Sequence, residues 1–412
     1  MPSRRPAPAR PRTARHARRP ESHRVLTGVA LAVVALLAFG VTGAATAYTK
    51  LQGNIESADI TDLLGKDRPT PAAEPDPDDP NAGRALNILL MGSDDRSGEN
   101  AEIGGEVEGM RSDTTILMHV SADRQRVELI SIPRDTLVDI PACPRSDGTE
   151  SRAQKGQFNA AFSIGAQSGQ VSDAAVCTIK TVEANTGVFV DDFVVIDFAG
   201  FIRMVDALGG VPMCVPEKME DAEAGLSLEA GSQTLDGSTA LALARARKEV
   251  GDGSDTSRLV RQQQLLAAMV QSVQSKNLLT DVPELLQFLN AATSSITASP
   301  NLASITNLSG LAFSLRGTLG GNISFMTVPF APAPTDRNRV VMTAEADVLW
   351  ERVAADQPIV EPATPAAPTD PAAPADPAAT DAPAAPAEPE PAPSKTPGKD
   401  PITADDVSTV CA

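Results

Sequence analysis

Apolar residues divide the chain into three parts. Residues 25–49 carry no charge, and Leu26–Phe39 within them are almost wholly apolar, a length sufficient to span a bilayer as a helix. Between residues 85 and 355, short apolar runs alternate with segments in which apolar residues recur at helical spacing. Residues 356–412 are rich in Pro, Ala, Asp and Glu, a composition that cannot bury a core. The pattern predicts a transmembrane helix, one folded domain and a disordered tail.

The strongest local pattern within the folded region is a pair of apolar runs around a polar turn. Thr114–Val120 (TTILMHV) and Val127–Ile132 (VELISI) flank the sequence SADRQR, and this arrangement predicts a β-hairpin. In an antiparallel hairpin, the start of one strand lies beside the end of the other. We therefore expect Asp113, which precedes the first strand, to lie beside Arg134, which follows the second.

The remaining runs predict a mixture of strands and helices. Ala85–Met91 is a continuous apolar run ending at Gly92, as expected for a buried strand. Further strands are expected at Phe193–Asp197, Val211–Pro216 and Ile323–Val328, and helices at Phe158–Ile164, Ser172–Thr186, Phe198–Leu208, Ser238–Glu249, Asp255–Lys276, Asp281–Asn290 and Leu302–Leu315. Such alternation predicts an α/β fold with helices packed on a mixed sheet. Ser97–Met110 and Val138–Gln157 are expected to be loops.

The flanks of the apolar segment predict the topology. The first 24 residues contain eight Arg and one Glu, so the positive-inside rule places them in the cytoplasm. Residues 25–49 then form a single-pass anchor in the cell membrane, residues 50–84 an extracytoplasmic linker, and residues 85–355 an extracytoplasmic domain. A cleaved signal peptide is the alternative, because Ala45–Ala47 (ATA) resembles a cleavage site. The apolar segment is longer than a usual signal core, which favours an uncleaved signal-anchor.

Charge and histidine content exclude two classes of function. The formal net charge is −18 despite the Arg-rich N-terminus, which argues against a nucleic-acid partner. Of the three histidines, His16 and His23 lie in the N-terminal segment, which leaves only His119 in the domain. A multi-histidine zinc site is therefore excluded. We expect His119 to be a packed strand residue rather than a catalytic base.

The four cysteines are Cys143, Cys177, Cys214 and Cys411, and no two form a CxxC motif. An even number of cysteines in an exported chain suggests one or two disulfides. Three pairings are open from the sequence. We favour Cys143 with Cys177, because both flank the same loop and helix.

The candidate chemistry rests on carboxylates and arginines. Asp94, Asp95 and Asp113 stand at strand ends and suit Mg²⁺, which usually takes one or two carboxylates together with substrate phosphate. The fixed cations are Arg134, Arg245, Arg247, Arg258 and Arg261, and guanidinium groups match phosphate oxygens. Arg258 and Gln262 are four residues apart, on one face of a helix. Each residue on its own is also compatible with a solvated salt bridge.

Seven stretches together resemble the LytR-CpsA-Psr family, in its actinobacterial form. They read NILLMGSDDR, RSDTTILMHV, ELISIPRD, FNAAFSIG, VVIDFAGFIRMVDALGGVPMCV, LDGSTALALARARK and GDGSDTSRLVRQQQ, and they cover about Leu86–Met269 behind one anchor. The resemblance implies an α-β-α sandwich around a mixed central β-sheet, with an apolar groove for a prenyl chain. It also implies a Mg²⁺-dependent phosphotransferase of cell-wall biogenesis.

The resemblance assigns roles to individual residues. Asp94 and Asp113 match metal-binding aspartates, and Asp135 either orients Arg134 or takes a proton. The catalytic set is Arg134, Asp135, Arg245, Arg247 and Arg258, and the pyrophosphate-binding set is Arg134, Arg245, Arg247, Arg258 and Gln262. The chain departs from the family at Leu243, where many members have an aromatic residue, and at Lys155, which lies two residues before the position where some members have a lysine.

The activity implied is transfer of a glycopolymer from a polyprenyl-pyrophosphate carrier to peptidoglycan, with formation of a phosphodiester. The expected partners are the lipid-linked glycopolymer, peptidoglycan and the membrane. Two other functions stay open at this point. One is a membrane-anchored regulator of the envelope without catalysis, and the other is a pyrophosphatase that releases the polymer.

Overall fold

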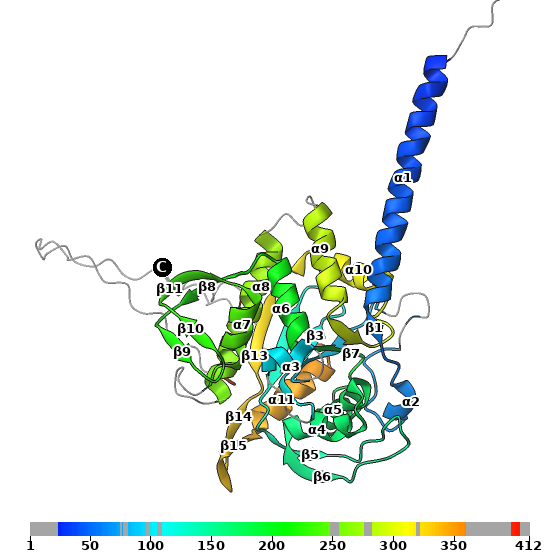
Figure 1. The fold of residues 1–412 in the computed structure, drawn as a ribbon. Helices are drawn as coiled ribbons and strands as arrows, with labels where there is room; N and C mark the ends of the chain where they lie inside the picture. The colour runs from blue at the N-terminus through cyan, green and yellow to red at the C-terminus, as the bar shows by residue number, and fades with distance from the viewer. Residues whose placement is uncertain are drawn as a thin grey trace, which may run out of the picture. The chain divides into compact units, whose positions relative to one another are not determined.

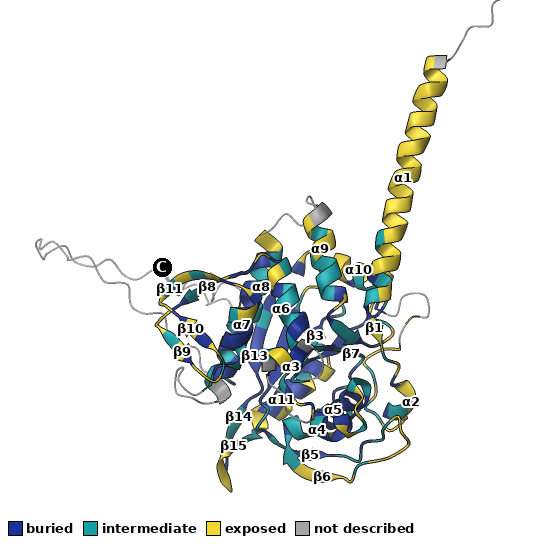
Figure 2. Ribbon diagram, in the orientation of Figure 1, coloured by how far each residue is buried: buried dark blue, intermediate teal, exposed yellow. Residues whose placement is uncertain are grey.

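The computed structural model describes residues 24–74, 76, 81–95, 99–104, 109–247, 255–275, 282–318, 322–359 and 397–403. The chain divides into two units, Met1–Thr49 and Lys50–Ala412 (Figure 1). The helix α1 (Arg24–Asn54) begins in the first unit. Its segment Val25–Asn54 is long and apolar enough to cross a membrane, and residues 25–46 of this segment are exposed (Figure 2). These properties fit the predicted membrane anchor.

The second unit is built on a mixed sheet, which among the described residues has eight strands. In sheet order they are β1 (Glu56–Ser57), β12 (Ile296–Ala298), β7 (Asp192–Ile196), β2 (Leu86–Ser93), β3 (Ser112–Val120), β4 (Val127–Ile132), β13 (Ile323–Thr327) and β16 (Ile402–Thr403). β2 pairs parallel with β7 and β4 pairs parallel with β13, whereas β2, β3 and β4 pair antiparallel in turn. The predicted hairpin is confirmed as β3–β4.

Helices cover both faces of this sheet. One face packs on α4 (Phe158–Gly165), α5 (Val171–Thr186) and α11 (Ala344–Ala354), and the other on α6 (Phe198–Ala207), α7 (Gly237–Arg245), α8 (Asp255–Ser275) and α10 (Ile305–Ser314), with α9 (Val282–Thr293) against α6. Strand β2 has a continuously apolar sequence because both of its faces are buried. Ile88 packs into one core and Leu89 into the other, because successive side chains point to opposite faces. Figure 2 shows the buried strands between the helical layers. The predicted α-β-α sandwich is confirmed.

Among the described residues, four two-stranded ribbons accompany the sheet. They are β5–β6 (Leu137–Ile140 and Gln154–Gln157), β8–β11 (Val211–Val215 and Gly231–Leu235), β9–β10 (Met219–Asp221 and Leu226–Leu228) and β14–β15 (Phe330–Ala333 and Asp336–Met342). Residues 138–157 were expected to be a loop, but β5 and β6 form their two ends. The short helix α3 (Glu99–Gly104) lies within the other expected loop. A run of four residues leaves too little periodicity to reveal such ribbons.

The start of the predicted linker belongs to the folded unit. Ile55, Ile60 and Leu64 are buried, the last as part of the short helix α2 (Thr61–Leu64). β1 adds to the sheet edge beside β12. Further along, Arg68 forms an ion pair of 2.6 Å with Glu183. The first part of the predicted linker therefore contributes buried residues and an edge strand to the folded unit.

Part of the predicted tail is also ordered. Most of residues 356–412 lie outside the described residues, but 397–403 are described. Ile402 is buried, and β16 pairs antiparallel with the edge strand β13. Ser324 and Phe325 of this edge strand are thereby paired with another segment of the same chain.

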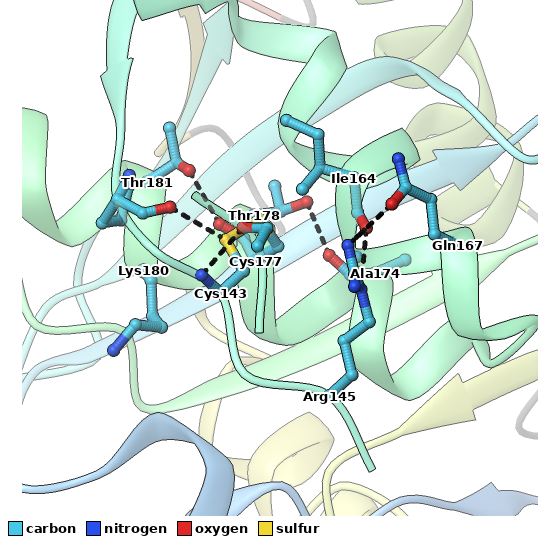
Figure 3. Close-up of a disulfide and its surroundings, with 12 residues drawn as sticks. Cys143, Arg145, Ile164, Gln167, Ala174, Cys177, Thr178, Lys180 and Thr181 are labelled. Atoms are coloured by element: carbon cyan, nitrogen blue, oxygen red, sulfur yellow. Dashed lines mark hydrogen bonds between the residues drawn. A yellow bond between two sulfur atoms is a disulfide. The ribbon is translucent and has the colours of Figure 1, made fainter. Parts of the chain in front are cut away.

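A disulfide joins Cys143 to Cys177, as favoured from the sequence (Figure 3). The bond ties the segment between β5 and β6 to the middle of α5. Arg145 attaches the same segment to α4, because its Nη2 donates to the carbonyl of Ile164 at 2.8 Å. Cys214 is also disulfide-bonded. Cys411 lies outside the described residues.

His119 is a packed strand residue, as expected. Its side chain is fully buried. Nδ1 lies 2.7 Å from Oδ1 of Asn87, and Nε2 lies 3.1 Å from Oδ1 of Asp356. Burial lowers the pKa of His119 and outweighs the opposing effect of the Asp356 carboxylate. The contact holds the residues after α11 against the sheet, far from the chemistry predicted at the other end of β3.

Candidate functional site

A pocket of about 460 Å³ lies where β2, β3 and β7 meet the helices α6, α7 and α8. One part of its wall is charged or polar, with Asp94, Asp113, Arg134, Asp197, Asp221, Glu223, Arg245, Arg247, Arg258 and Gln262. Another part is apolar, with Leu90, Ile116, Ile196, Phe198, Phe201, Leu241, Leu265 and Leu266. The pocket therefore offers positive charge and a hydrophobic surface to the same ligand.

The ends of three neighbouring strands bring the first residues together. Asp94 directly follows β2, and its backbone N–H donates to the carbonyl of Arg111 at 2.7 Å. The register of β2 against β3 shifts beside Gly92, which places Asp113 at a β-bulge. Bulges of this kind redirect a side chain beside an active site. Arg134 follows β4, and its Nη1 donates to Oδ1 of Asp113 at 2.7 Å. The contact predicted from the hairpin is confirmed.

The end of α7 directs two arginines into the pocket. The helix was expected to continue to Glu249, but it ends at Arg245, and Ala246 has an extended ψ of 136°. In a continuous helix, residues two apart do not face the same side. The break therefore allows Arg245 and Arg247 to line the same pocket. Arg245 also stacks on the ring of Phe198, with Cζ 4.8 Å from the ring centroid.

Arg261 holds this break in place. Its Nη2 donates to the carbonyl of Ala246 at 2.6 Å, and its side chain lies outside the main pocket. Arg261 was expected to be one of the arginines that bind phosphate, but in the structure it bonds the backbone at the end of α7. Asp95 likewise does not line the pocket, and its backbone N–H donates to the hydroxyl of Ser93 at 3.1 Å.

Helix α8 supplies Arg258 and Gln262, which both line the pocket as their spacing predicted. Arg258 is only 2% exposed, and its Nη2 lies 3.5 Å from the backbone oxygen of Asp113. Gln262 donates from Nε2 to the carbonyl of Ala244 at 2.9 Å. This bond fastens the middle of α8 to the end of α7, so the two arginine-bearing helices form one wall.

The arginines determine the charge state of Asp113. Burial by itself raises the pKa of this carboxyl group. The nearby charge and hydrogen bond of Arg134, followed by the charges of Arg258 and Arg247, outweigh burial and lower the pKa below its usual value. Asp113 is therefore a carboxylate at neutral pH. A carboxylate of such low proton affinity is suited to bind a cation rather than to accept a proton.

The donor set partly fits a magnesium ion. Within the part of the chain that the structure describes, no three His, Cys, Asp or Glu side chains gather as a metal site. Asp94 and Asp113 nevertheless both border the pocket. Because Mg²⁺ usually takes only one or two carboxylates and completes its shell with water and substrate phosphate, this pair meets its protein requirement.

Sequence reasoning missed two residues that support the site. Asp221 in β9 is buried, and its Oδ2 accepts from the backbone N–H of Arg247 at 2.7 Å. Asn100 in α3 is also buried, and it bonds both the Asp197 carboxylate and the N–H of Ala199, at 2.8 Å each. Asp197, which lines the pocket, directly follows β7, a strand parallel to β2. A polar residue at the end of a parallel strand is a common sign of a ligand site, so the sequence could have pointed to Asp197. Asp221 and Asn100 carried no such signal.

The family of the chain follows from a comparison with known sequences. The sequence model of the LytR_cpsA_psr family matches residues 47–353. The chain belongs to this family. The match includes the pocket, the supporting ribbons and the residues just before the folded unit.

Several curated relatives share this region. "Probable cell wall biosynthesis protein LcpB" of Corynebacterium glutamicum is 32% identical over 267 residues, which cover 63% of this chain and 58% of the relative. "Cell wall biosynthesis protein LcpA" of the same organism is 28% identical over 268 residues, covering 60% and 50%. The "Polyisoprenyl-teichoic acid--peptidoglycan teichoic acid transferase TagU" of Enterococcus faecalis is 31% identical over 206 residues, covering 50% and 59%. The chain thus spans between half and three-fifths of these relatives.

Solved structures show the same fold. The "LytR-Csp2A-Psr enzyme from Actinomyces oris" aligns with a TM-score of 0.51 at 22% identity, covering 73% of this chain and 96% of that one. "TagT bound to LI-WTA" aligns with a TM-score of 0.50 at 22% identity, covering 71% and 98%. At this identity the likeness supports the architecture.

Proposed function

We propose that the protein transfers a glycopolymer from a polyprenyl-pyrophosphate carrier to peptidoglycan and forms a phosphodiester. The observation that carries the proposal is that one pocket has both an arginine-rich wall and an apolar wall. Arg134, Arg245, Arg247 and Arg258 border it beside the apolar side chains of α6, α7 and α8. A polyprenyl pyrophosphate has a doubly charged head and a hydrocarbon chain, so it matches both walls at once.

The names of relatives support this choice of reaction. TagU of Enterococcus faecalis and TagT of Bacillus subtilis are both named polyisoprenyl-teichoic acid–peptidoglycan teichoic acid transferases. The Corynebacterium relatives are named for cell wall biosynthesis. We infer the same class of reaction here, with the identity of the glycopolymer left to experiment.

In the proposed reaction, a sugar hydroxyl of peptidoglycan attacks the phosphorus atom nearest the glycopolymer. The bond from that phosphorus to the bridging oxygen breaks, polyprenyl phosphate leaves with the electron pair, and the hydroxyl proton is released. Phosphoryl transfer depends mainly on positioning and on neutralising charge. The arginines after β4, at the end of α7 and on α8 would bind the pyrophosphate and stabilise the leaving phosphate. Asp94 and Asp113 would hold Mg²⁺, which supplies further neutralising charge when bound.

Asp135 fits an orienting role better than a proton-accepting one. Its carboxylate does not line the pocket. Oδ2 lies 3.6 Å from Nε of Arg134, and Oδ1 accepts from Nη1 of Arg339 at 3.0 Å. The carboxylate thus contacts two guanidinium groups and lies behind the arginine that borders the pocket.

We also propose that α1 is an uncleaved anchor with a cytoplasmic N-terminus. The Arg-rich segment before the uncharged stretch supports this orientation. Protease added to intact cells stripped of their wall should remove the unit after Lys50 and leave the N-terminal segment protected. Protection of the whole chain would contradict this orientation.

A transfer assay tests the proposed function. The full chain in lipid nanodiscs would receive a polyprenyl-pyrophosphate-linked oligosaccharide and purified peptidoglycan. A product bound to peptidoglycan is the expected result. A free phosphorylated oligosaccharide would identify a pyrophosphatase instead. Absence of any product, together with absence of a polyprenyl pyrophosphate among the lipids that co-purify with the chain, would favour a regulator.

A further inference from the structure

Behind Arg134 lies a row of alternating charges that leads away from the pocket. Arg134 contacts Asp113 on the pocket side at 2.7 Å and faces Asp135 on the other side, with Nε 3.6 Å from Oδ2. Asp135 in turn accepts from Nη1 of Arg339 at 3.0 Å, and Arg339 Nε lies 3.9 Å from Asp336. The row ends in the ribbon β14–β15, which no site motif of the sequence includes.

Backbone contacts hold this ribbon beside the residues that follow β4. The N–H of Val340 donates to the carbonyl of Asp135 at 3.3 Å, and Thr136 forms an isolated parallel bridge with Val340. Arg339 is therefore fixed next to Asp135 by its own strand. A side chain 204 residues further along the chain thereby reaches the residue next to Arg134.

Gln157 also contacts the guanidinium group of Arg339. In the amide orientation that satisfies both of its polar atoms, its oxygen accepts from Nε of Arg339 at 2.6 Å and its nitrogen donates to Asn159 at 3.3 Å. The side chains of Arg134 and Asp135 are each 14% exposed and that of Arg339 is 29% exposed. These ion pairs are therefore partly shielded from water, which strengthens them relative to fully exposed pairs. Arg339 itself does not line the pocket.

We infer that Arg339 is a positioning residue for Arg134 and acts through Asp135. The inference rests on the proposed function of the pocket. Because Arg339 occupies Oδ1 of Asp135, the carboxylate is shared, and Nη1 of Arg134 stays on Asp113 at the pocket wall. Without Arg339, the whole carboxylate would be available to Arg134. The guanidinium would then be drawn from the pocket toward Asp135.

Arg337 offers a matched control for this inference. It lies two residues earlier on the same strand and carries the same charge, but it is exposed. Substitution of either arginine removes one positive charge from the same ribbon. A general effect of net charge or ribbon stability would therefore appear in both variants, whereas an effect through Asp135 would appear only in the Arg339 variant.

The test compares transfer kinetics of the full chain in nanodiscs. Arg339→Ala should lower kcat roughly 10- to 100-fold, the range expected when a catalytic group is slightly misplaced, with a smaller change in KM for the lipid donor. Arg337→Ala should stay within about twofold of the wild type. Arg339→Lys should recover part of the loss, because the positive charge beside Asp135 returns.

A double-mutant cycle distinguishes positioning from an independent effect. If Arg339 acts through Arg134, the Arg339→Ala change should cause no further loss in an Arg134→Ala background. Losses that multiply, or equal effects of Arg339→Ala and Arg337→Ala, would overturn the inference.

If the wild type transfers nothing, the proposed function fails. The inference about Arg339 is then tested by measuring the affinity of each variant for geranylgeranyl pyrophosphate. Arg339→Ala must then weaken binding in the wild-type background and leave it unchanged in the Arg134→Ala background.

Discussion

The Nη1 atom of Arg134 lies 2.7 Å from Oδ1 of Asp113, across the open ends of two antiparallel strands. The pair joins the two kinds of group that the proposed reaction needs, a carboxylate for a metal ion and a guanidinium for phosphate. It also lowers the pKa of the Asp113 carboxyl group against the opposing effect of burial.

Removal of the Arg134 guanidinium should abolish most transfer. We expect Arg134→Ala to lower the rate on the order of 10²-fold or more, because one group that stabilises transition-state charge typically contributes that much. The melting temperature should change little. Arg152→Ala, at an exposed position, is the control for lost charge. Near-normal transfer by Arg134→Ala at saturating Mg²⁺ would contradict the assigned role.

Magnesium dependence should disappear with the two pocket carboxylates. The double variant Asp94→Ala, Asp113→Ala should show only residual transfer. This remaining activity should not respond to Mg²⁺ titration or to chelation. Asp95→Ala should keep the Mg²⁺ response, because Asp95 does not line the pocket. A Mg²⁺ response that survives in the double variant would place the metal on other groups.

Asp221 should act on transfer through Arg247. Asp221→Ala removes the acceptor that holds the backbone N–H of Arg247, and we expect a roughly 10-fold or larger loss of kcat from the misplaced arginine. The same change also removes the bonds to Glu223 and Ala224, so stability should fall by about 1–3 kcal/mol. Asp221→Asn, which keeps one oxygen acceptor, should lose less. Equal activity of wild type and Asp221→Ala would argue against this role, and Glu220→Gln on the same strand serves as the control.

Stability should decline in mild acid because of His119. Burial lowers the pKa of His119 in the folded state, so above the unfolded value of about 6.5 both states are neutral. As pH falls from there toward the folded pKa, only the unfolded state takes up the proton, and stability is lost. Melting temperatures between pH 7 and pH 5 should fall less steeply for His119→Gln than for the wild type. His16→Gln is the matched control, and identical slopes for all three chains would contradict the prediction.

Peptide mapping without reduction should find Cys143 joined to Cys177. Cys214 should also be joined to another peptide. Cys143→Ser together with Cys177→Ser should lower stability by about 2–4 kcal/mol, because the bond closes a loop of 34 residues. Detection of free thiols in the unfolded, unreduced chain would contradict these pairings.

Strong local patterns made the framework of the fold predictable. The β3–β4 hairpin, the buried strand β2 and the helix α5 were recognised because continuous or periodic apolar residues span their whole length. From the hairpin alone, antiparallel geometry placed Asp113 beside Arg134. The spacing of Arg258 and Gln262 on α8 was equally informative, since residues four apart on a helix share a face.

Shorter elements could not be predicted in the same way. The ribbon β9–β10 has strands of three residues, and its Asp221 carries no pattern that relates it to Arg247. The end of α7 at Arg245 was also missed, because the sequence after it still favours a helix. Only the contacts with α8, including the bond from Arg261 to Ala246, show why the helix ends there.

The sequence by itself determined the longer strands and helices, the apolar anchor segment and the main charged residues of the pocket wall, such as Asp113, Arg134 and Arg258. These features depend on neighbours along the chain, so local composition and periodicity reveal them. The tertiary structure decided which cations face the pocket, which of them hold the scaffold, and which distant residue supports Arg134. Those choices depend on contacts such as that between Asp135 and Arg339, 204 residues apart, and no local pattern records where two such segments meet in the folded chain.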